Sequence, residues 1–275
     1  MIGFNYLGKM GQLGNQMFQY ATVLGVSEGI GTTCCIPNHG EIVDDGIGNK
    51  LRVELFDAFK INPKNTGFIP ALDKRETTFT YDDSFLKLDP THDYNLIGFF
   101  QTPKYFNHIK EKVKKEFTFH DSIVNECQDI LELFEDPVGL HIRRGDYLIN
   151  SANHHNLNIE YYEQALKQFP KNQQVVIFSD DPEWCLEQLL FVDDRFIVSE
   201  GNSSYHDLYL MTQCSDFIIA NSTYSWWGAW LADTGKVIAP HVWFGPNNSD
   251  KSLEDLYPNH WTVIPYSKLL WLGML

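Results

Sequence analysis

The second half of the chain alternates short apolar runs with segments whose apolar residues recur at helical spacing. The apolar runs predict strands at residues 138–142, 175–178, 196–198, 217–220 and 237–239. The segments between them predict helices at residues 159–169, 182–190, 206–214 and 224–231. Buried strands that alternate with helices are typical of βαβ units in a parallel sheet. We therefore predict a Rossmann-like α/β lobe over residues 136–275.

The first half carries a weaker pattern. It predicts a strand at residues 2–7, a glycine-rich turn at 8–14 and a helix from Gln16 to about Val26. A polar, glycine-containing stretch over residues 38–49 predicts a long loop, and residues 60–94 predict few elements. Helices are expected again at residues 104–117 and 122–134. The pattern predicts a first α/β lobe over residues 1–135, with a lobe boundary near residues 134–138.

Composition narrows the class of protein. Of 275 residues, 43% are hydrophobic and 21% are charged, which excludes a chain disordered throughout. The formal charge of −15 argues against nucleic-acid binding. An anionic ligand would therefore need a local group of cations, and the adjacent residues Arg143 and Arg144 are the first candidates.

The cysteines and the apolar runs bear on location. The five cysteines are scattered without metal-binding spacing, which favours free thiols in a reducing cytoplasm. We see no secretory leader and no apolar run near the ~18 residues of a membrane span. The apolar closing segment, residues 269–275, is expected to dock on the body of the protein, with a partner or peripheral membrane contact as alternatives.

Polar clusters follow three of the predicted strands. They occupy residues 141–147, 179–182 and 221–227. Because the carboxyl ends of parallel strands share one edge of a sheet, and ligands collect there, we expect these clusters to meet.

Arginine matches phosphate geometry, so one of the two arginines is predicted to bind a phosphate; a structural pair with Asp146 is the alternative. Residues 221–223 precede a helix, where a cap and a phosphate site are compatible. Asp180 and Asp181 could bind Mg²⁺. We nevertheless predict that no metal binds there. Asp181 precedes Pro182, as the cap of a helix would, and the two arginines already supply positive charge for a phosphate ligand.

Five ordered segments carry a family resemblance. They read GQLGNQMFQYA (11–21), FQTPKYF (100–106), HIRRGDY (141–147), FSDD (178–181) and NSTYSWWGA (221–229). Together they resemble the bacterial α-1,2-fucosyltransferases of glycosyltransferase family 11. The resemblance implies a GT-B architecture, with two Rossmann-like lobes that face each other across a cleft and the acceptor on the first lobe. It also implies inverting, metal-independent transfer, without a cofactor, from GDP-β-L-fucose to the 2-hydroxyl of a terminal β-galactoside on an oligosaccharide or glycan.

The resemblance also suggests roles for individual residues. Donor-binding residues would be His141, Arg143, Arg144, Asp180, Asp181, Asp207, Asn221, Ser222, Thr223 and Ser225. Acceptor-binding residues would be Gln16, Tyr147, His154 and Trp226. Catalytic residues would be Asn15, Arg143, Arg144, Asp146 and His154. Asp146 and His154 are alternative bases, and a reaction path that needs little help from a base stays open.

Two departures from the family pattern concern the acceptor. Gln12 stands where a second glycine is usual, and the segment that starts at His154 reads HHNL rather than His-Gly-x-Cys. Two other functions stay open: the same fold acting on another sugar nucleotide, and a non-catalytic carbohydrate-binding protein. The seven tryptophans motivate the latter, which leaves the arginine pair unexplained.

Overall fold

A computed structural model describes residues 1–265, so the closing apolar segment 269–275 lies outside the described residues. The chain forms two compact units. Among the described residues, the first comprises residues 1–126 and 250–259, and the second comprises residues 127–249 and 260–265. The predicted boundary between residues 135 and 136 thus falls inside the second unit. Residues 250–259, expected in the second lobe, belong to the first unit.

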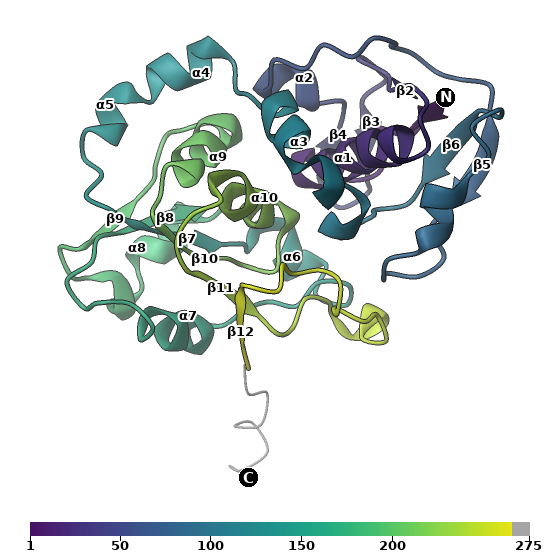
Figure 1. Cartoon of the computed structure of the whole chain (residues 1–275). Coiled ribbons are helices and arrows are strands. Elements are labelled where there is room, and N and C mark those ends of the chain that lie inside the picture. Colours follow the sequence, from purple (N-terminus) through teal and green to yellow (C-terminus); the bar gives the residue numbers. More distant parts are fainter. Residues whose placement is uncertain (266–275) are drawn as a thin grey trace. The chain divides into compact units, whose positions relative to one another are not determined.

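The first unit contains a four-stranded parallel sheet in the order β2-β1-β6-β5 (Figure 1). Its strands are β1 (Ile2–Gly3), β2 (Cys34–Cys35), β5 (Leu72–Arg75) and β6 (Tyr94–Ile97). A small antiparallel hairpin of β3 (Val43–Asp44) and β4 (Lys50–Leu51) begins within the loop predicted at residues 38–49 and ends just after it. Helical elements are α1 (Leu13–Gly29), α2 (Leu55–Ala58), α3 (Lys110–Glu116) and α4 (Asp121–Glu126), with 3₁₀ turns η1 (Asp83–Lys87), η2 (Pro103–Tyr105) and η3 (Asn107–Ile109).

Helix α1 is the central element of this unit. Apolar and polar positions alike are buried along it, including Gln16, Gln19 and Thr22, so the helix is covered around most of its circumference. Gly25 allows the helix to pack closely against the backbone at Tyr105, because a Cβ at position 25 would lie 2.0 Å from the Tyr105 carbonyl oxygen. The core beside it is aromatic, and the Phe100 ring packs edge-on against those of Phe85 and Tyr105.

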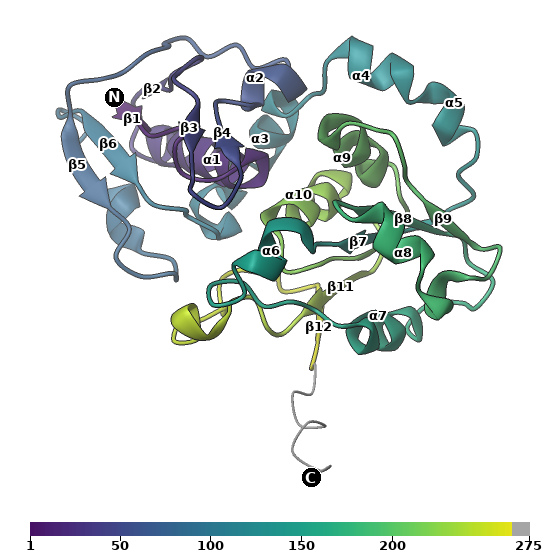
Figure 2. The same ribbon diagram turned by 180° about the vertical axis from the view of Figure 1, so that it is seen from behind.

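The second unit contains a six-stranded parallel sheet in the order β9-β8-β7-β10-β11-β12 (Figures 1 and 2). Its strands are β7 (Val138–Ile142), β8 (Val175–Ser179), β9 (Phe196–Val198), β10 (Asp216–Ile218), β11 (Val237–Pro240) and β12 (Thr262–Ile264). The chain builds outward from β7 to one side and then returns to build outward from β10 to the other. This is the doubly wound order of a Rossmann fold, with its switch point between β7 and β10.

The helices of this unit are α5 (Gln128–Leu131), α6 (Gly145–Ile149), α7 (Ile159–Leu166), α8 (Pro182–Leu186), α9 (Ser204–Thr212) and α10 (Thr223–Ala232), with 3₁₀ turns η4 (Leu189–Phe191) and η5 (Pro246–Asn248). Of these, α7 to α10 overlap the four helices predicted between the strands. Helices α9 and α10 lie together on one face of the sheet and α7 lies on the other (Figures 1 and 2). The core between the layers is apolar, with Leu140, Ile177 and Ile218 fully buried on the strands.

The elements of the second unit follow the prediction more closely than those of the first. The strands at 138–142 and 196–198 have the predicted bounds, whereas α6 and β12 were not predicted. The helix predicted at residues 104–117 is instead two 3₁₀ turns followed by α3, because the backbone leaves helical angles at Phe106 and again at Ile109. Among the described residues, no helix combines the length and the apolar character needed to cross a bilayer.

Candidate functional site

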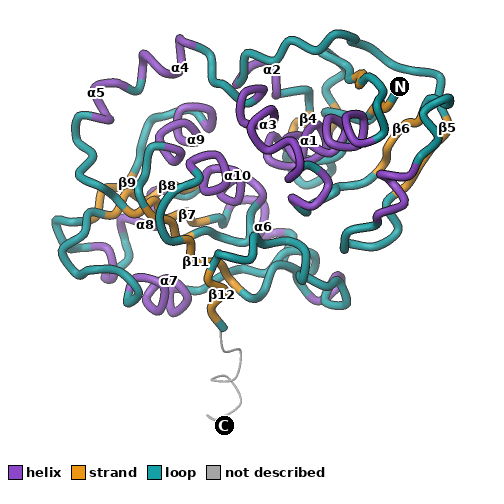
Figure 3. Tube along the Cα trace, in the orientation of Figure 1, coloured by secondary structure: helices purple, strands orange, loops and turns teal. Residues whose placement is uncertain are grey.

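The carboxyl ends of β10, β7 and β8 are neighbours in the sheet of the second unit. The loops that follow them are drawn in teal among the strands and helices in Figure 3. The structure therefore brings together the three polar clusters that the sequence places after these strands. Since the switch point lies between β7 and β10, the loops after these two strands border the crevice where open α/β sheets bind ligands.

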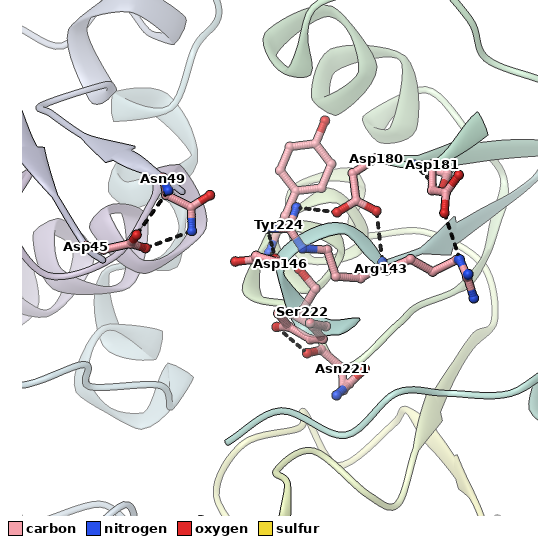
Figure 4. Close-up of polar contacts among 12 residues, drawn as sticks. Asp45, Asn49, Arg143, Asp146, Asp180, Asp181, Asn221, Ser222 and Tyr224 are labelled. Carbon is pink, nitrogen blue, oxygen red and sulfur yellow. Dashed lines mark hydrogen bonds and ion pairs between the residues drawn. The ribbon is translucent and has the colours of Figure 1, made fainter. Parts of the chain in front are cut away.

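Arg143 occupies the centre of this edge (Figure 4). Its Nη2 lies 2.7 Å from Asp146 Oδ1 and its Nη1 lies 3.1 Å from Asp180 Oδ2. Burial alone would lower the pKa of Arg143, but the carboxylates of Asp180 and Asp146 outweigh it and raise that pKa. The Arg143 side chain is 19% exposed, so it is held in place by its two partners and is still partly open to solvent. Such a held cation is suited to a phosphate.

Arg144 turns to a different partner, as expected of successive residues at a strand end. Its Nε donates to Asp181 Oδ2 at 2.9 Å, and its guanidinium carbon lies 4.0 Å from the centre of the Trp184 ring. Asp181 also caps α8, as predicted, because its Oδ1 accepts a hydrogen bond from the Trp184 amide. Asp180 is thus paired with Arg143, and Asp181 is paired with Arg144. No group of three or more metal-binding side chains occurs among the described residues.

His141 lies on β7, two residues before Arg143, and is 4% exposed. Its ring packs against the ring of Tyr224, with the centroids 5.3 Å apart. Burial, helped by the charge of Arg143, lowers the pKa of His141 to about 3, so the imidazole is neutral near pH 7. Its buried Nδ1 has no hydrogen-bond partner in the part of the chain that the structure describes.

The start of α10 supplies backbone N–H groups to the same edge. Ser222 is the N-cap, and its hydroxyl accepts a hydrogen bond from the Tyr224 amide at 3.3 Å. Thr223 is half-buried at the first helical position. Ser225 is buried and its hydroxyl donates to the carbonyl oxygens of Ala220 and Ser222. The inward orientation of Ser225 argues against the predicted contact with a donor.

Asn221 is also turned inward. It is 1% exposed, and its side-chain amide donates to the carbonyl oxygens of His155 and Trp243, each at 2.8 Å. The residue therefore joins the loop after β10 to two other loops. This arrangement assigns Asn221 a structural role in place of the predicted donor contact.

Asp207 lies in the first turn of α9, near the carboxyl end of β9. Its Oδ1 accepts a hydrogen bond from the Ser199 hydroxyl at 2.7 Å, and Asn202 donates to that hydroxyl in turn. Burial raises the pKa of Asp207. A half-buried carboxylate held from one side is suited to the N–H groups of a nucleobase.

The predicted acceptor residues divide into two groups. Tyr147 and His154 stack on each other in the second unit, with their ring centroids 4.2 Å apart. Trp226 has no exposed surface and packs against Trp227 and Trp230, which argues against contact with an acceptor.

Gln16 and Asn15 lie in the first unit. Gln16 is fully buried, and it holds the Arg52 carbonyl oxygen and the Glu54 amide, so its predicted acceptor contact is also disfavoured. Asn15 is half-buried and accepts a hydrogen bond from Gln101.

Sequence reasoning missed several residues at the edge of the second unit. The Trp184 ring contacts the Arg144 guanidinium, and the Tyr224 ring packs against the His141 ring. Hydrogen bonds from Asn202 to Ser199 and from Ser199 to Asp207 orient the Asp207 carboxylate. The spacing of Trp184 after the cap Asp181 was available as a signal. The contacts of Ser199 and Tyr224 depend on how neighbouring loops fold and leave no local trace.

Comparisons with known proteins agree with this description. The profile of glycosyl transferase family 11 matches residues 2–265. The chain is 32% identical over 289 aligned positions to an alpha-1,2-colitosyltransferase of Escherichia coli, covering 92% of this chain and 96% of that protein. It is 33% identical to the O-antigen biosynthesis glycosyltransferase WbnK of Escherichia coli, covering 63% of each chain. It is 29% identical to galactoside alpha-(1,2)-fucosyltransferase 1 of Alouatta caraya, covering 81% of this chain and 63% of that protein.

Solved structures share the fold at low identity. The fucosyltransferase NodZ from Bradyrhizobium matches with a TM-score of 0.55 at 12% identity, over 86% of this chain and 93% of that one. A crystal structure of POFUT1 in complex with GDP-fucose matches with a TM-score of 0.53 at 12% identity, over 85% of this chain and 94% of that one. These matches confirm the predicted α/β fold of GT-B type with parallel sheets. With its profile match over residues 2–265, the chain belongs to glycosyl transferase family 11.

Proposed function

We propose that this protein is an inverting, metal-independent glycosyltransferase that moves L-fucose from GDP-β-L-fucose to the 2-hydroxyl of a terminal β-galactoside. Family membership supports glycosyl transfer, and the α-1,2 linkage in the names of two relatives supports the bond formed. The main observation in support of the donor site is that Arg143 forms ion pairs with Asp146 and Asp180 at the switch point of the second sheet. The five free cysteines support a reducing, cytoplasmic setting.

In this proposal the diphosphate binds Arg143, with further N–H donors from the start of α10. The acceptor oxygen attacks C1 of fucose on the face opposite GDP, and the C1–oxygen bond to the diphosphate breaks. The electron pair of that bond passes to a phosphate oxygen, where the fixed guanidinium stabilises the developing charge. Electrostatic stabilisation of this kind contributes on the order of 10²–10³ in rate for a single donor.

The guanine ring would lie toward Asp207 and His141. Guanine presents N–H donors on the edge that a carboxylate can accept, and Asp207 is already oriented by Ser199. The neutral imidazole of His141 avoids placing a second cation beside Arg143. These two residues would distinguish guanine from other bases.

The proton of the acceptor hydroxyl needs a destination. Asp146 is already engaged in its ion pair with Arg143 at 2.7 Å. His154, on the same edge, is the better placed of the two predicted candidates.

A second donor deserves a test because of one relative. The alpha-1,2-colitosyltransferase matches this chain over nearly its whole length. Colitose is fucose without its 3-hydroxyl, so the two donors differ by one hydrogen-bonding group. We expect the GDP-linked form of either sugar to compete for the same site.

Calorimetric titration into EDTA-treated protein tests the donor. GDP and GDP-fucose should bind, whereas UDP and ADP should bind at least tenfold more weakly. A transfer assay in EDTA with a galactoside acceptor then tests the reaction, with GDP-colitose as the competing donor. Equal affinity for GDP, UDP and ADP, or activity that requires Mg²⁺, would contradict the proposal.

A further inference from the structure

Tyr147 joins three loops at the carboxyl edge of the second sheet. It lies in α6, directly after the arginine pair, and is 9% exposed. Its hydroxyl donates to the carbonyl oxygen of Asn221 at 3.0 Å, in the loop after β10. Its own carbonyl oxygen accepts a hydrogen bond from the Asn156 side chain at 3.1 Å. The residue is therefore buried beneath the site, and this burial argues against the predicted contact with an acceptor.

The ring of Tyr147 contacts two charge-bearing side chains of the site. The imidazole of His154 is stacked on it at 4.2 Å, with an interplanar angle of 13°. The guanidinium carbon of Arg143 lies 5.4 Å from the centre of the same ring. The same ring therefore contacts both the arginine and the imidazole.

The backbone around His154 is fixed from the other side. His154 pairs with Phe244 in an antiparallel bridge, and the Gly245 amide donates to the Asn153 carbonyl oxygen at 2.9 Å. A Cβ on Gly245 would lie 2.5 Å from the Ser151 carbonyl oxygen, so the two segments approach closely. With the backbone held there, stacking on Tyr147 helps to set the plane of the His154 ring.

We propose that Tyr147 is a positioning residue that couples the diphosphate site at Arg143 to the imidazole of His154. Through it, binding of a nucleoside diphosphate sets the orientation in which His154 meets the acceptor hydroxyl. The proposal rests on the function proposed above, because it takes a sugar hydroxyl as the group that His154 addresses. Tyr147 itself touches neither substrate.

Two substitutions separate the ring from its hydroxyl. Tyr147→Phe keeps the stacking surface and loses the bond to Asn221, whereas Tyr147→Leu loses both. The matched control is Tyr161→Phe, because the Tyr161 hydroxyl is likewise buried and donates to a carbonyl oxygen of the same connection, that of Ile219, at 2.7 Å. We expect Y147F and Y161F to lose stability equally and to keep kcat within about threefold of wild type. Y147L should lower kcat by roughly 10- to 100-fold, the cost of a misplaced reacting group, with GDP affinity within threefold.

A double-mutant cycle tests the coupling itself. His154→Ala should lower kcat by at least ~10², the usual contribution of a general base. If Tyr147 acts through His154, the Y147L/H154A double variant should be no slower than H154A alone. Effects that multiply would overturn the proposal, and so would a loss in Y147L that appears only as weaker GDP binding.

A measurement without turnover uses wild-type protein with ¹³C-labelled histidine. Saturating GDP should shift the imidazole resonances of His154, assigned by their loss in H154A, and the shift should shrink by more than half in Y147L. Bound GDP that leaves the His154 signals unmoved in wild type would refute the coupling alone. A protein that binds no GDP would instead refute the proposed donor, so the two failures are distinguishable.

Discussion

Substitution of Arg143 by lysine keeps the positive charge and changes its geometry. The two terminal nitrogens of Arg143 contact different carboxylates, Asp146 at 2.7 Å and Asp180 at 3.1 Å. A lysine ammonium is a single point of charge, so it cannot hold both aspartates and also present a fork to a diphosphate. Arg143→Lys should therefore weaken GDP binding, lower kcat and lower the free energy of unfolding, each by a different amount.

The expected magnitudes follow from these contacts. Loss of one charge-assisted hydrogen bond to the diphosphate costs about 1.5–3 kcal/mol, which corresponds to roughly 10- to 150-fold weaker GDP binding. Loss of stabilisation on the leaving group should lower kcat by a further ~10²–10³. Breaking a fully buried ion pair costs about 3–5 kcal/mol. The Arg143 side chain is 19% exposed and one carboxylate partner is retained, so we expect about 1–2 kcal/mol in unfolding free energy.

Three measurements on one preparation separate these effects. Calorimetry gives GDP affinity, initial rates at saturating donor and acceptor give kcat, and urea unfolding gives stability. The control is Arg195→Lys, since Arg195 lies in the same unit, stacks on the Phe196 ring and contacts the Pro170 carbonyl oxygen. GDP affinity within twofold and kcat within threefold of wild type in R143K would refute the assignment of Arg143 to the diphosphate.

Three further predictions test other parts of the structure. Because the pKa of His141 is about 3 in the folded chain and ~6.5 when unfolded, the unfolded chain binds the extra proton between these values. Stability should fall by up to ~1.4 kcal/mol for each pH unit below 6.5, and urea unfolding at pH 7 and 5 should show a shallower fall in His141→Gln; an equal fall would contradict the assignment. Asp207→Asn should weaken GDP binding by roughly 10- to 100-fold and leave pyrophosphate binding unchanged, and an equal loss for both would place Asp207 elsewhere. Gly25→Ala should cost about 1–3 kcal/mol by overpacking against Tyr105, whereas Gly40→Ala, with open space around it, should cost less than about 0.5 kcal/mol; equal unfolding midpoints would contradict the packing.

The second unit was predictable because its signals are local. Strands such as residues 175–178 are continuous apolar runs followed by polar residues, and Pro182 begins a helix as its fixed backbone angle favours. Parallel strands buried on both faces leave such runs in any sequence. The meeting of the three clusters at one edge then follows from the direction of the strands.

The first unit was harder to predict because its short strands depend on contacts distant in sequence. β1 spans two residues and pairs with strands that begin at Cys34 and Tyr94, so no periodicity could form. Within the site, the hydrophobic and polar pattern could not predict the directions of the Asn221, Ser225 and Trp226 side chains. A polar or aromatic residue beside a ligand site has the same letter whether it faces the ligand or supports a neighbouring loop.

Residues 250–259 have a consequence for protein engineering. Asp255, in this late segment, pairs with Lys104, and its Oδ2 accepts a hydrogen bond from the Tyr81 amide at 2.8 Å, both within the first unit. A chimera made by a single exchange at residue 126 would combine Lys104 from one parent with Asp255 from the other. Exchange of the first unit between family members should therefore use three junctions, so that residues 250–259 travel with residues 1–126.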